Sequence, residues 1–281
     1  MDAVRDLGEL DGPVLVFGGP CGNLEATEAV LAEARRLGIP PGRTICTGDV
    51  VAYCADPRAT VDAVRGAGIP VVMGNVEESL ATNSDDCGCG YVEGSTCDIL
   101  SLQWFGYARA AIDDEARAWM AALPRGLRFD LGGRRLLVVH GAPSAIGRNV
   151  YGSDPDHELA REIDASGCDG VIGGHSGLPF TRIVDGRLWH NAGVVGLPAN
   201  DGTPRGWYSL LSRENGGIAV ELRPLDYDHA GAAAKMRARG LPEAYAEALE
   251  GGLWPDMDVL PAAERARKGI AISPRRVIWC A

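Results

Sequence analysis

The stretch Val171-Ile172-Gly173-Gly174-His175-Ser176-Gly177-Leu178-Pro179-Phe180 gives the clearest indication of how this chain folds. A β-branched pair leads into two glycines and a histidine, and the chain then leaves through a turn at Pro179. A buried strand ends in this way when its last residues present a polar side chain instead of filling a core. We therefore predict that His175 follows a strand and faces a ligand.

Three other stretches have the same form: Thr47-Gly48-Asp49, Val72-Met73-Gly74-Asn75 and Val138-Val139-His140-Gly141. With His175, these strand ends supply one carboxylate, one amide and two imidazoles. This set of donors suits a divalent metal ion such as Fe, Mn or Zn. The alternative, that Asp49, Asn75, His140 and His175 only cap turns, is disfavoured by the ordered recurrence of the pattern.

Length and composition indicate a globular protein. The chain has 281 residues, of which 46% are hydrophobic, and a chain of this length can bury a large core in one domain. We predict a single domain over residues 1–281, with a core at about 13–223 and a C-terminal helical extension at 224–281. No apolar run approaches the ~20 residues that span a bilayer. The acidic N-terminus does not resemble a signal peptide, so we expect a cytoplasmic location and no membrane.

The net charge of −11 argues against a nucleic-acid partner, because such binding depends on Lys and Arg that neutralise phosphates. A negative protein can still bind a small anionic substrate through a metal ion, and we expect a substrate of this kind. The sequence does not indicate an oligomeric state.

The first part of the chain predicts parallel strands joined by helices. A strand at Pro13–Phe17 is followed by a helix at Leu24–Leu37, a strand at Thr44–Thr47, a helix at Ala59–Arg65 and a strand at Val71–Met73. This β-α-β-α-β order is typical of crossover connections. The segment Glu77–Gly94 is polar and has no period, so we predict a loop there. Helices are expected again at Ile99–Ala108 and Asp114–Leu123.

The second part mixes antiparallel and parallel strands. Hairpins are predicted around Gly132-Gly133 and Asp185-Gly186, with further strands at residues 170–172, 207–211 and 218–222. Helices are predicted at 156–166, 229–239 and 242–249. The pattern as a whole predicts an α/β fold in which two mixed β-sheets pack face to face and are flanked by helices, an αββα sandwich.

The order of these motifs resembles the calcineurin-like metallophosphoesterases. The resemblance rests on Gly48-Asp49, Gly74-Asn75, His140-Gly141 and Gly174-His175, followed by Asn191-Ala192-Gly193, and it covers roughly Val14 to Leu211. It is closest to the small bacterial YfcE-like branch. The resemblance implies the αββα sandwich and a pair of metal ions that activate water for attack on phosphorus.

Only one of the two implied metal sites has its expected ligands. By resemblance, one ion takes Asp49, Asn75, His140 and His175, and all four are present. The other ion takes an Asp-x-His pair and a second histidine after Gly-His, for which this chain has Gly19, Cys21 and Gly177. Val76 stands at the position where the family has the histidine that protonates the leaving group. We therefore expect one complete metal site and no ordinary general acid.

Two residues are candidates for the remaining catalytic work. His190 directly precedes Asn191 and is the nearest histidine to replace the missing acid; the alternative is a histidine whose hydrogen bonds are satisfied at a strand end. Asn23, with Gly22, precedes the first predicted helix and is a candidate for binding phosphate at the helix N-terminus; the alternative is a turn and helix cap.

The chain also has eight cysteines, which are many for a cytosolic protein of this size. Cys21 stands at a ligand position, and a thiolate can replace an imidazole on Zn or Fe; otherwise it is a small tolerated residue. Cys54, Cys87, Cys89 and Cys97 are candidates for a thiolate site that holds Fe, Zn or an iron–sulfur centre. For Cys87, Cys89 and Cys97 the alternative is a surface loop with unreactive thiols. The other three, Cys46, Cys168 and Cys280, are predicted to be small core residues.

These residues support three functional hypotheses. The first is an atypical metal-dependent phosphoesterase that hydrolyses a phosphate mono- or diester through a metal-activated water. The second keeps the fold but places iron or an iron–sulfur centre on thiolates, for redox or non-phosphate chemistry. The third is a non-catalytic binding protein.

Overall fold

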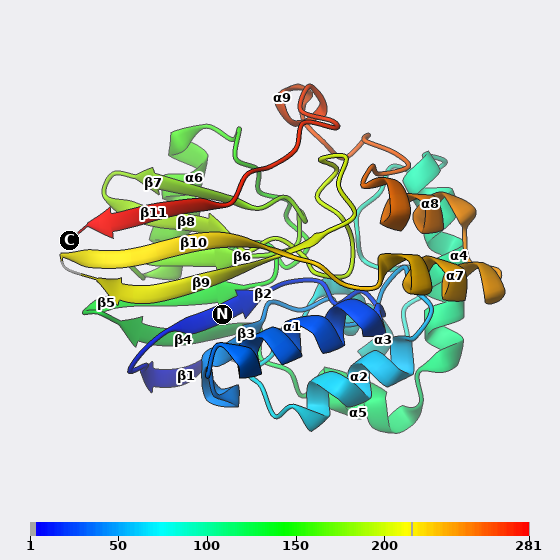
Figure 1. Cartoon of the computed structure of the whole chain (residues 1–281), viewed down its shortest axis with the longest axis horizontal. Helices are drawn as coiled ribbons and strands as arrows, with labels where there is room; N and C mark the ends of the chain where they lie inside the picture. The colour runs from blue at the N-terminus through cyan, green and yellow to red at the C-terminus, as the bar shows by residue number, and fades with distance from the viewer. Residues whose placement is uncertain (1–3, 215, 281) are drawn as a thin grey trace.

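In the computed structural model, which describes residues 4–214 and 216–280, two β-sheets pack face to face with helices outside them (Figure 1). This confirms the predicted αββα sandwich. The first sheet has the order β1 (Val4–Glu9), β4 (Gly126–Leu131), β5 (Arg134–Val139), β6 (Gly170–Gly173), β8 (Arg187–Asn191) and β7 (Phe180–Val184). The second has the order β11 (Arg275–Cys280), β10 (Gly217–Leu225), β9 (Gly206–Glu214), β2 (Val14–Phe17) and β3 (Thr44–Cys46).

The central strands are apolar throughout because both of their faces are buried. In β2, Val14 and Val16 point into the interface between the sheets, while Leu15 and Phe17 point to the helices. Strand β5 has the same alternation between the two sides. Since successive side chains of a strand point to opposite faces, one short apolar run serves two cores.

The helices cover the outer faces of both sheets. Helix α6 packs on β6, β7 and β8 of the first sheet, and most of the others lie against the second sheet and beyond its edge (Figure 1). The helices are α1 (Leu24–Arg36), α2 (Pro57–Gly66), α3 (Asn75–Ala81), α4 (Thr96–Ala111), α5 (Asp114–Ala121), α6 (Asp156–Ser166), α7 (His229–Ala238), α8 (Glu243–Gly251) and α9 (Ala262–Arg265), with a 3-10 turn, η1, at Pro41–Arg43.

Two predictions around residue 75 were wrong. The segment predicted as a loop from Glu77 begins inside helix α3, and only the chain after Ala81 is irregular. The helix starts where the backbone N–H of Gly74 donates to the side chain of Glu77, three residues on, which is a capping arrangement that the polar composition obscured. The predicted strand Val71–Met73 is reduced to a single bridge between Cys46 and Val71.

The sequence did not reveal β1 and β11, which lie at one edge of each sheet. Strand β11 lies in the region predicted as a helical extension, which therefore contains α7, α8 and α9 but also a strand of the second sheet. Both strands carry arginines on exposed positions, as edge strands commonly carry charge, and this charge hides their short apolar pattern. Trp279 of β11 is buried, and its indole N–H donates to the Gly186 carbonyl at 2.8 Å.

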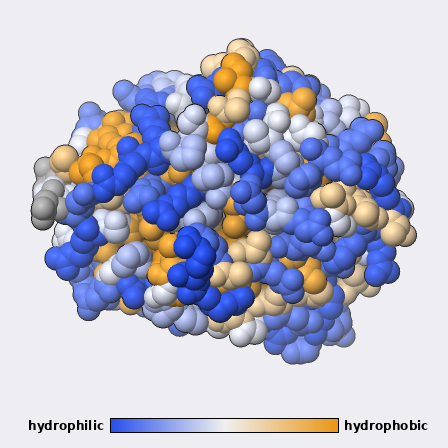
Figure 2. Space-filling view, viewed as in Figure 1, coloured by the Kyte–Doolittle hydropathy of each residue, from blue (hydrophilic) through white to orange (hydrophobic). Residues whose placement is uncertain are grey.

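The face shown in Figure 2 is mainly hydrophilic, with hydrophobic residues in small separate patches. In the part of the chain that the structure describes, none of the helices has the length and apolar character that crossing a membrane requires.

Candidate metal centre

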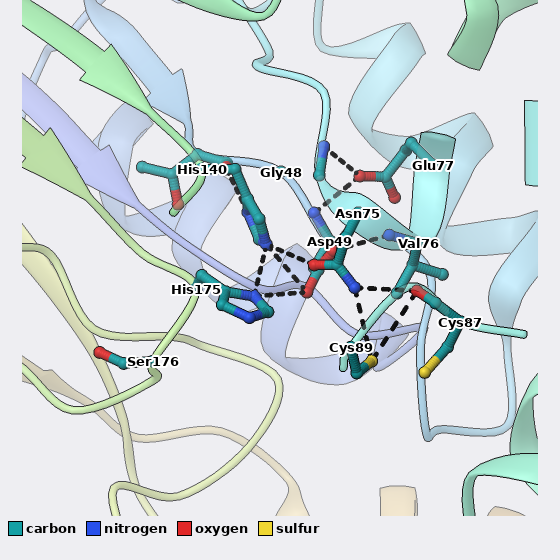
Figure 3. A network of polar contacts seen from close by, with 12 residues as sticks. Gly48, Asp49, Asn75, Val76, Glu77, Cys87, Cys89, His140, His175 and Ser176 are labelled. Carbon is teal, nitrogen blue, oxygen red and sulfur yellow. Dashed lines mark hydrogen bonds and ion pairs between the residues drawn. The ribbon is translucent and has the colours of Figure 1, made fainter. Parts of the chain in front are cut away.

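The four predicted ligands come from both sheets and meet at one end of the sandwich. Asp49 follows β3 of the second sheet, and Asn75 opens helix α3. His140 and His175 follow β5 and β6, which are parallel neighbours in the first sheet. Figure 3 shows the four side chains pointing toward one another. The structure thus brings together all four residues that the strand-end pattern singled out.

His140 lies at the middle of this cluster. Its Nε2 is 2.9 Å from Asn75 Oδ1, 2.9 Å from His175 Nδ1 and 3.3 Å from Asp49 Oδ2. The His175 Nδ1 and Asp49 Oδ2 atoms are 4.0 Å apart. Within the described residues, Asp49, His140 and His175 form the one group of three or more His, Cys, Asp or Glu residues whose donor atoms all lie within 4.8 Å of one another.

Contacts outside the cluster orient two of the ligands. The Thr47 carbonyl, which can only accept, lies 2.8 Å from His140 Nδ1, so this nitrogen carries the proton and Nε2 presents its lone pair inward. The amide nitrogen of Asn75 donates to the Cys87 carbonyl at 2.9 Å and to Cys89 Sγ at 3.4 Å (Figure 3). Asn75 Oδ1 is therefore turned toward His140. Lone pairs from four side chains converge on a small volume, which is the arrangement that a cation stabilises.

The charges within the cluster depend on one another. Burial disfavours the charged form of both His140 and Asp49, but their mutual attraction and hydrogen bond outweigh it: the pKa of His140 is raised and the pKa of Asp49 is lowered. Burial and the neighbouring His140 lower the pKa of His175 to about 4. A proton on His140 and the Asp49 carboxylate thus stabilise each other, and a bound cation can take over the role of that proton.

Sequence reasoning missed Glu77, a fully buried residue that shapes the Asp49 turn. Its carboxylate accepts hydrogen bonds from the backbone N–H groups of Asp49, Val51 and Gly74 at 2.8, 3.2 and 2.9 Å. Asp49 has a positive φ of 52°, which is unusual for a residue other than glycine. Three hydrogen bonds to one buried carboxylate hold this conformation. The sequence does contain a pattern that indicates this role: Glu77 lies three residues after Gly74, at the N3 position where a glutamate commonly caps a helix.

Two apolar side chains occupy the other half of the site. A Cβ atom placed on Gly19 would lie 2.7 Å from Val194 Cγ1, and one on Gly177 would lie 3.4 Å from Trp254 Cζ2. Both glycines also have positive φ, of 42° and 71°. The residues present thus do not fit a second ion: two glycines, a valine and an indole line this side of the site, and none of their side chains offers a metal ligand.

The cysteines divide into two groups. Cys21, Cys89 and Cys97 line the cavity beside the ligand cluster, whereas Cys54 and Cys87 are buried outside its lining. Cys21 is not part of the cluster of Asp49, His140 and His175, and burial and the charge of Asp49 raise the pKa of its thiol. Its role as a ligand stays a prediction.

The three cysteines predicted as core residues differ from one another. Cys46 is fully buried and Cys168 is half-buried. Cys280 is exposed near the end of edge strand β11, so its assignment to the core was wrong.

The two predicted catalytic residues have structural roles instead. His190 is buried between the sheets, with its ring nitrogens 3.0 Å from Thr181 Oγ1 and 2.7 Å from Ser209 Oγ, and it does not line the cavity. Asn23 caps helix α1 by accepting from the Ala26 N–H, and its amide nitrogen donates to the Gly196 carbonyl at 3.0 Å. The hydrogen bonds of both side chains are made within the fold. His190 is therefore a histidine with satisfied hydrogen bonds, and Asn23 is a helix cap.

The motifs and the geometry agree with comparison to known proteins. A family model described as the calcineurin-like phosphoesterase superfamily domain matches residues 22–215. The chain belongs to this superfamily. The YfcE-like branch within it stays a prediction, and the superfamily assignment supports a hydrolase of the metallophosphoesterase kind.

Three proteins that resemble this chain share only 17–26% of its sequence. The uncharacterized protein MJ0912 of Methanocaldococcus jannaschii is 26% identical over 245 residues, covering 81% of this chain and 93% of that protein. Two solved structures are similar in fold, each covering 86% of this chain and 99% of their own. A metallophosphoesterase from Sphaerobacter thermophilus has a TM-score of 0.66 at 24% identity, and the hypothetical protein PH1004 from Pyrococcus horikoshii has 0.73 at 17%.

Replacing Glu77 tests its support of the Asp49 turn. In Glu77→Gln, an amide N–H₂ faces backbone N–H groups that need an acceptor, so we expect a loss of about 1–3 kcal/mol in the free energy of unfolding. Glu78→Gln is the matched control, because Glu78 makes only a partly exposed ion pair with Arg125, and a change below about 1 kcal/mol is expected. Urea denaturation measures both. Equal effects for the two variants would contradict the assigned role.

The pH dependence of stability tests the placement of His190. Burial lowers the pKa of His190 to about 3, whereas an unfolded histidine has a pKa of about 6.5. The unfolded chain therefore binds an extra proton between these values, and His190 makes stability fall as the pH drops through this window, by up to about 1.4 kcal/mol per pH unit. His190→Gln should flatten this slope, and His157→Gln, at an exposed helical site, should not. An unchanged slope in His190→Gln would refute a neutral buried ring.

Proposed function

We propose that this chain is a metal-dependent phosphoesterase that uses a single divalent ion, Fe, Mn or Zn, held by Asp49, Asn75, His140 and His175. The observation that supports it is the convergence of four oriented lone-pair donors beside a cavity, in a chain of the calcineurin-like phosphoesterase superfamily. Two imidazoles, one carboxylate and one amide oxygen satisfy most of the four to six positions that such an ion needs. We expect a small phosphate mono- or diester as the substrate.

A divalent ion bound there supplies a Lewis acid and lowers the pKa of a coordinated water. The chain's own residues prepare the site for it. The Thr47 carbonyl fixes the tautomer of His140, and the turn at Cys87 and Cys89 fixes the Asn75 amide. Asp49 balances positive charge in a pocket where its own carboxylate is largely buried.

The chain has no proton donor at position 76, where the family resemblance expects the histidine that protonates the leaving group. Val76 is buried and has no proton to donate, and His190 is enclosed between the sheets. Esters with good leaving groups, which depart without protonation, are therefore the better substrates.

A second candidate function is favoured by the thiols of Cys21, Cys89 and Cys97, all of which line the cavity. In this alternative, thiolates join the imidazoles on iron and the site carries out redox chemistry. Anaerobically purified protein with visible charge-transfer absorption and acid-labile sulfide would support it. Colourless protein that hydrolyses a phosphodiester would favour the phosphoesterase.

Hydrolysis of bis(4-nitrophenyl) phosphate tests the first proposal. We expect metal-dependent turnover that a chelator abolishes and that His140→Ala and His175→Ala each reduce at least about 100-fold, because a Lewis acid contributes several kcal/mol. His157→Ala is the control, since this exposed histidine of α6 lies outside the cluster, and it should retain full activity. Activity that survives in both cluster variants would refute the proposal.

A further inference from the structure

The cavity beside the ligand cluster has a polar floor and an apolar wall. Asp49, His140 and His175 form part of the floor. The wall includes residues with large apolar surfaces: Tyr53, Tyr91, Val194, Tyr245 and Trp254. The space open to the centres of water molecules is about 100 Å³, against the ~10–15 Å³ that one water needs. An organic group of several atoms fits there.

The apolar wall includes the places from which metal ligands are missing. Val194 lies against Gly19 and the Trp254 indole lies against Gly177, the two positions where the family resemblance expects ligands to a further ion. Trp254 is held firmly, because its indole N–H donates to the Pro198 carbonyl at 2.7 Å and its backbone N–H donates to Asn200 Oδ1 at 2.9 Å. The half of the site that lacks metal ligands is thus an apolar surface whose main side chain is held in place by hydrogen bonds.

Aromatic rings continue this surface away from the cluster. The ring centroids of Tyr53 and Tyr245 are 4.8 Å apart, and the hydroxyls of Tyr53 and Tyr91 are 3.0 Å apart. Tyr245 is buried in the hydrophobic core, so it cannot swing freely. Fixed rings of this kind bind an apolar or aromatic group with little loss of side-chain entropy.

The charges that line the cavity limit the net charge of a ligand that can bind there. None of the described residues that line it is a lysine or an arginine, and the carboxylates of Asp49 and Asp256 are both present. A single divalent ion with neutral imidazoles and the Asp49 carboxylate leaves one positive charge at the floor, and the Asp256 carboxylate in the lining brings the net charge of the cavity to zero. A phosphodiester monoanion therefore adds the smallest uncompensated negative charge, whereas a phosphomonoester dianion or a polyphosphate adds more negative charge that no lining cation balances.

From these observations we propose that the substrate is a phosphodiester with one uncharged aromatic ester group, which packs against Trp254 and Val194 while the phosphate faces the ligand cluster. This inference rests on the proposed function and names its substrate class. An aryl alcohol is also a leaving group that departs without a general acid, which agrees with Val76 at the position of the usual acid.

Calorimetric binding of two phosphodiesters of equal charge tests the apolar subsite. We expect diphenyl phosphate to bind at least roughly tenfold more tightly than dimethyl phosphate, because its ring is removed from water. Trp254→Ala should abolish most of this preference. Trp254→Phe, which keeps an aromatic face, should retain it within about threefold. Trp119→Ala, a change of the same kind on α5 outside the cavity lining, should leave it unchanged.

The outcomes separate the substrate class from the activity. Equal affinity for the two diesters, or a preference that persists in folded Trp254→Ala, overturns the apolar subsite even if the protein hydrolyses phosphodiesters. Tighter binding of phenyl phosphate dianion than of diphenyl phosphate also overturns it. A Trp254-dependent preference in protein without turnover supports the subsite and counts only against the phosphoesterase proposal.

Discussion

The structure depends on one electrostatic constraint: four side chains direct lone pairs at the same small volume around His140 Nε2. Such an arrangement is unfavourable unless a proton or a metal ion lies among the donors. The fold supplies the constraint by joining two sheets, because β3 delivers Asp49 from one and β5 and β6 deliver the histidines from the other. The packing of the two sheets therefore sets the distances between the ligands, and with them the affinity of the site for a cation.

The family resemblance implies metal ligands where this chain has Gly19 and Gly177, and this difference bears on the chemistry of the second half of the site. A cavity with one ion and several carboxylates would repel anions, but this chain fills the places of the missing ligands with Val194 and Trp254. Apolar filling lowers the local polarity, so an ion held by the four donors would attract a single negative charge more strongly. The absence of an ordinary acid at Val76 and the apolar wall thus favour the same kind of ester.

Much of the fold and the main cluster could be predicted from the sequence, because strand ends with glycine and a polar residue have few other uses. Asp49, Asn75, His140 and His175 were found in this way, and the structure brings them together. Strands β1 and β11 could not be found, since charged edge strands lack a long apolar run. Two polar residues, His190 and Asn23, were misassigned for a different reason. His190 and Asn23 were chosen by their proximity in sequence to motifs, but burial and side-chain hydrogen bonds decide whether a polar residue reaches a cavity. Glu77 was missed because the polar composition of its segment obscured the capping pattern with Gly74, and its contacts with the Asp49 turn are long-range. Trp254 was missed because it contacts the backbone of a distant segment, which no short pattern encodes.

The metal content of the natively purified protein tests the central claim most directly. One catalytic ion beside an apolar half-site predicts one equivalent of Fe, Mn or Zn per chain by elemental analysis, and a loss of that equivalent in His175→Ala. Two equivalents per chain, or one equivalent that His175→Ala retains, would contradict the account.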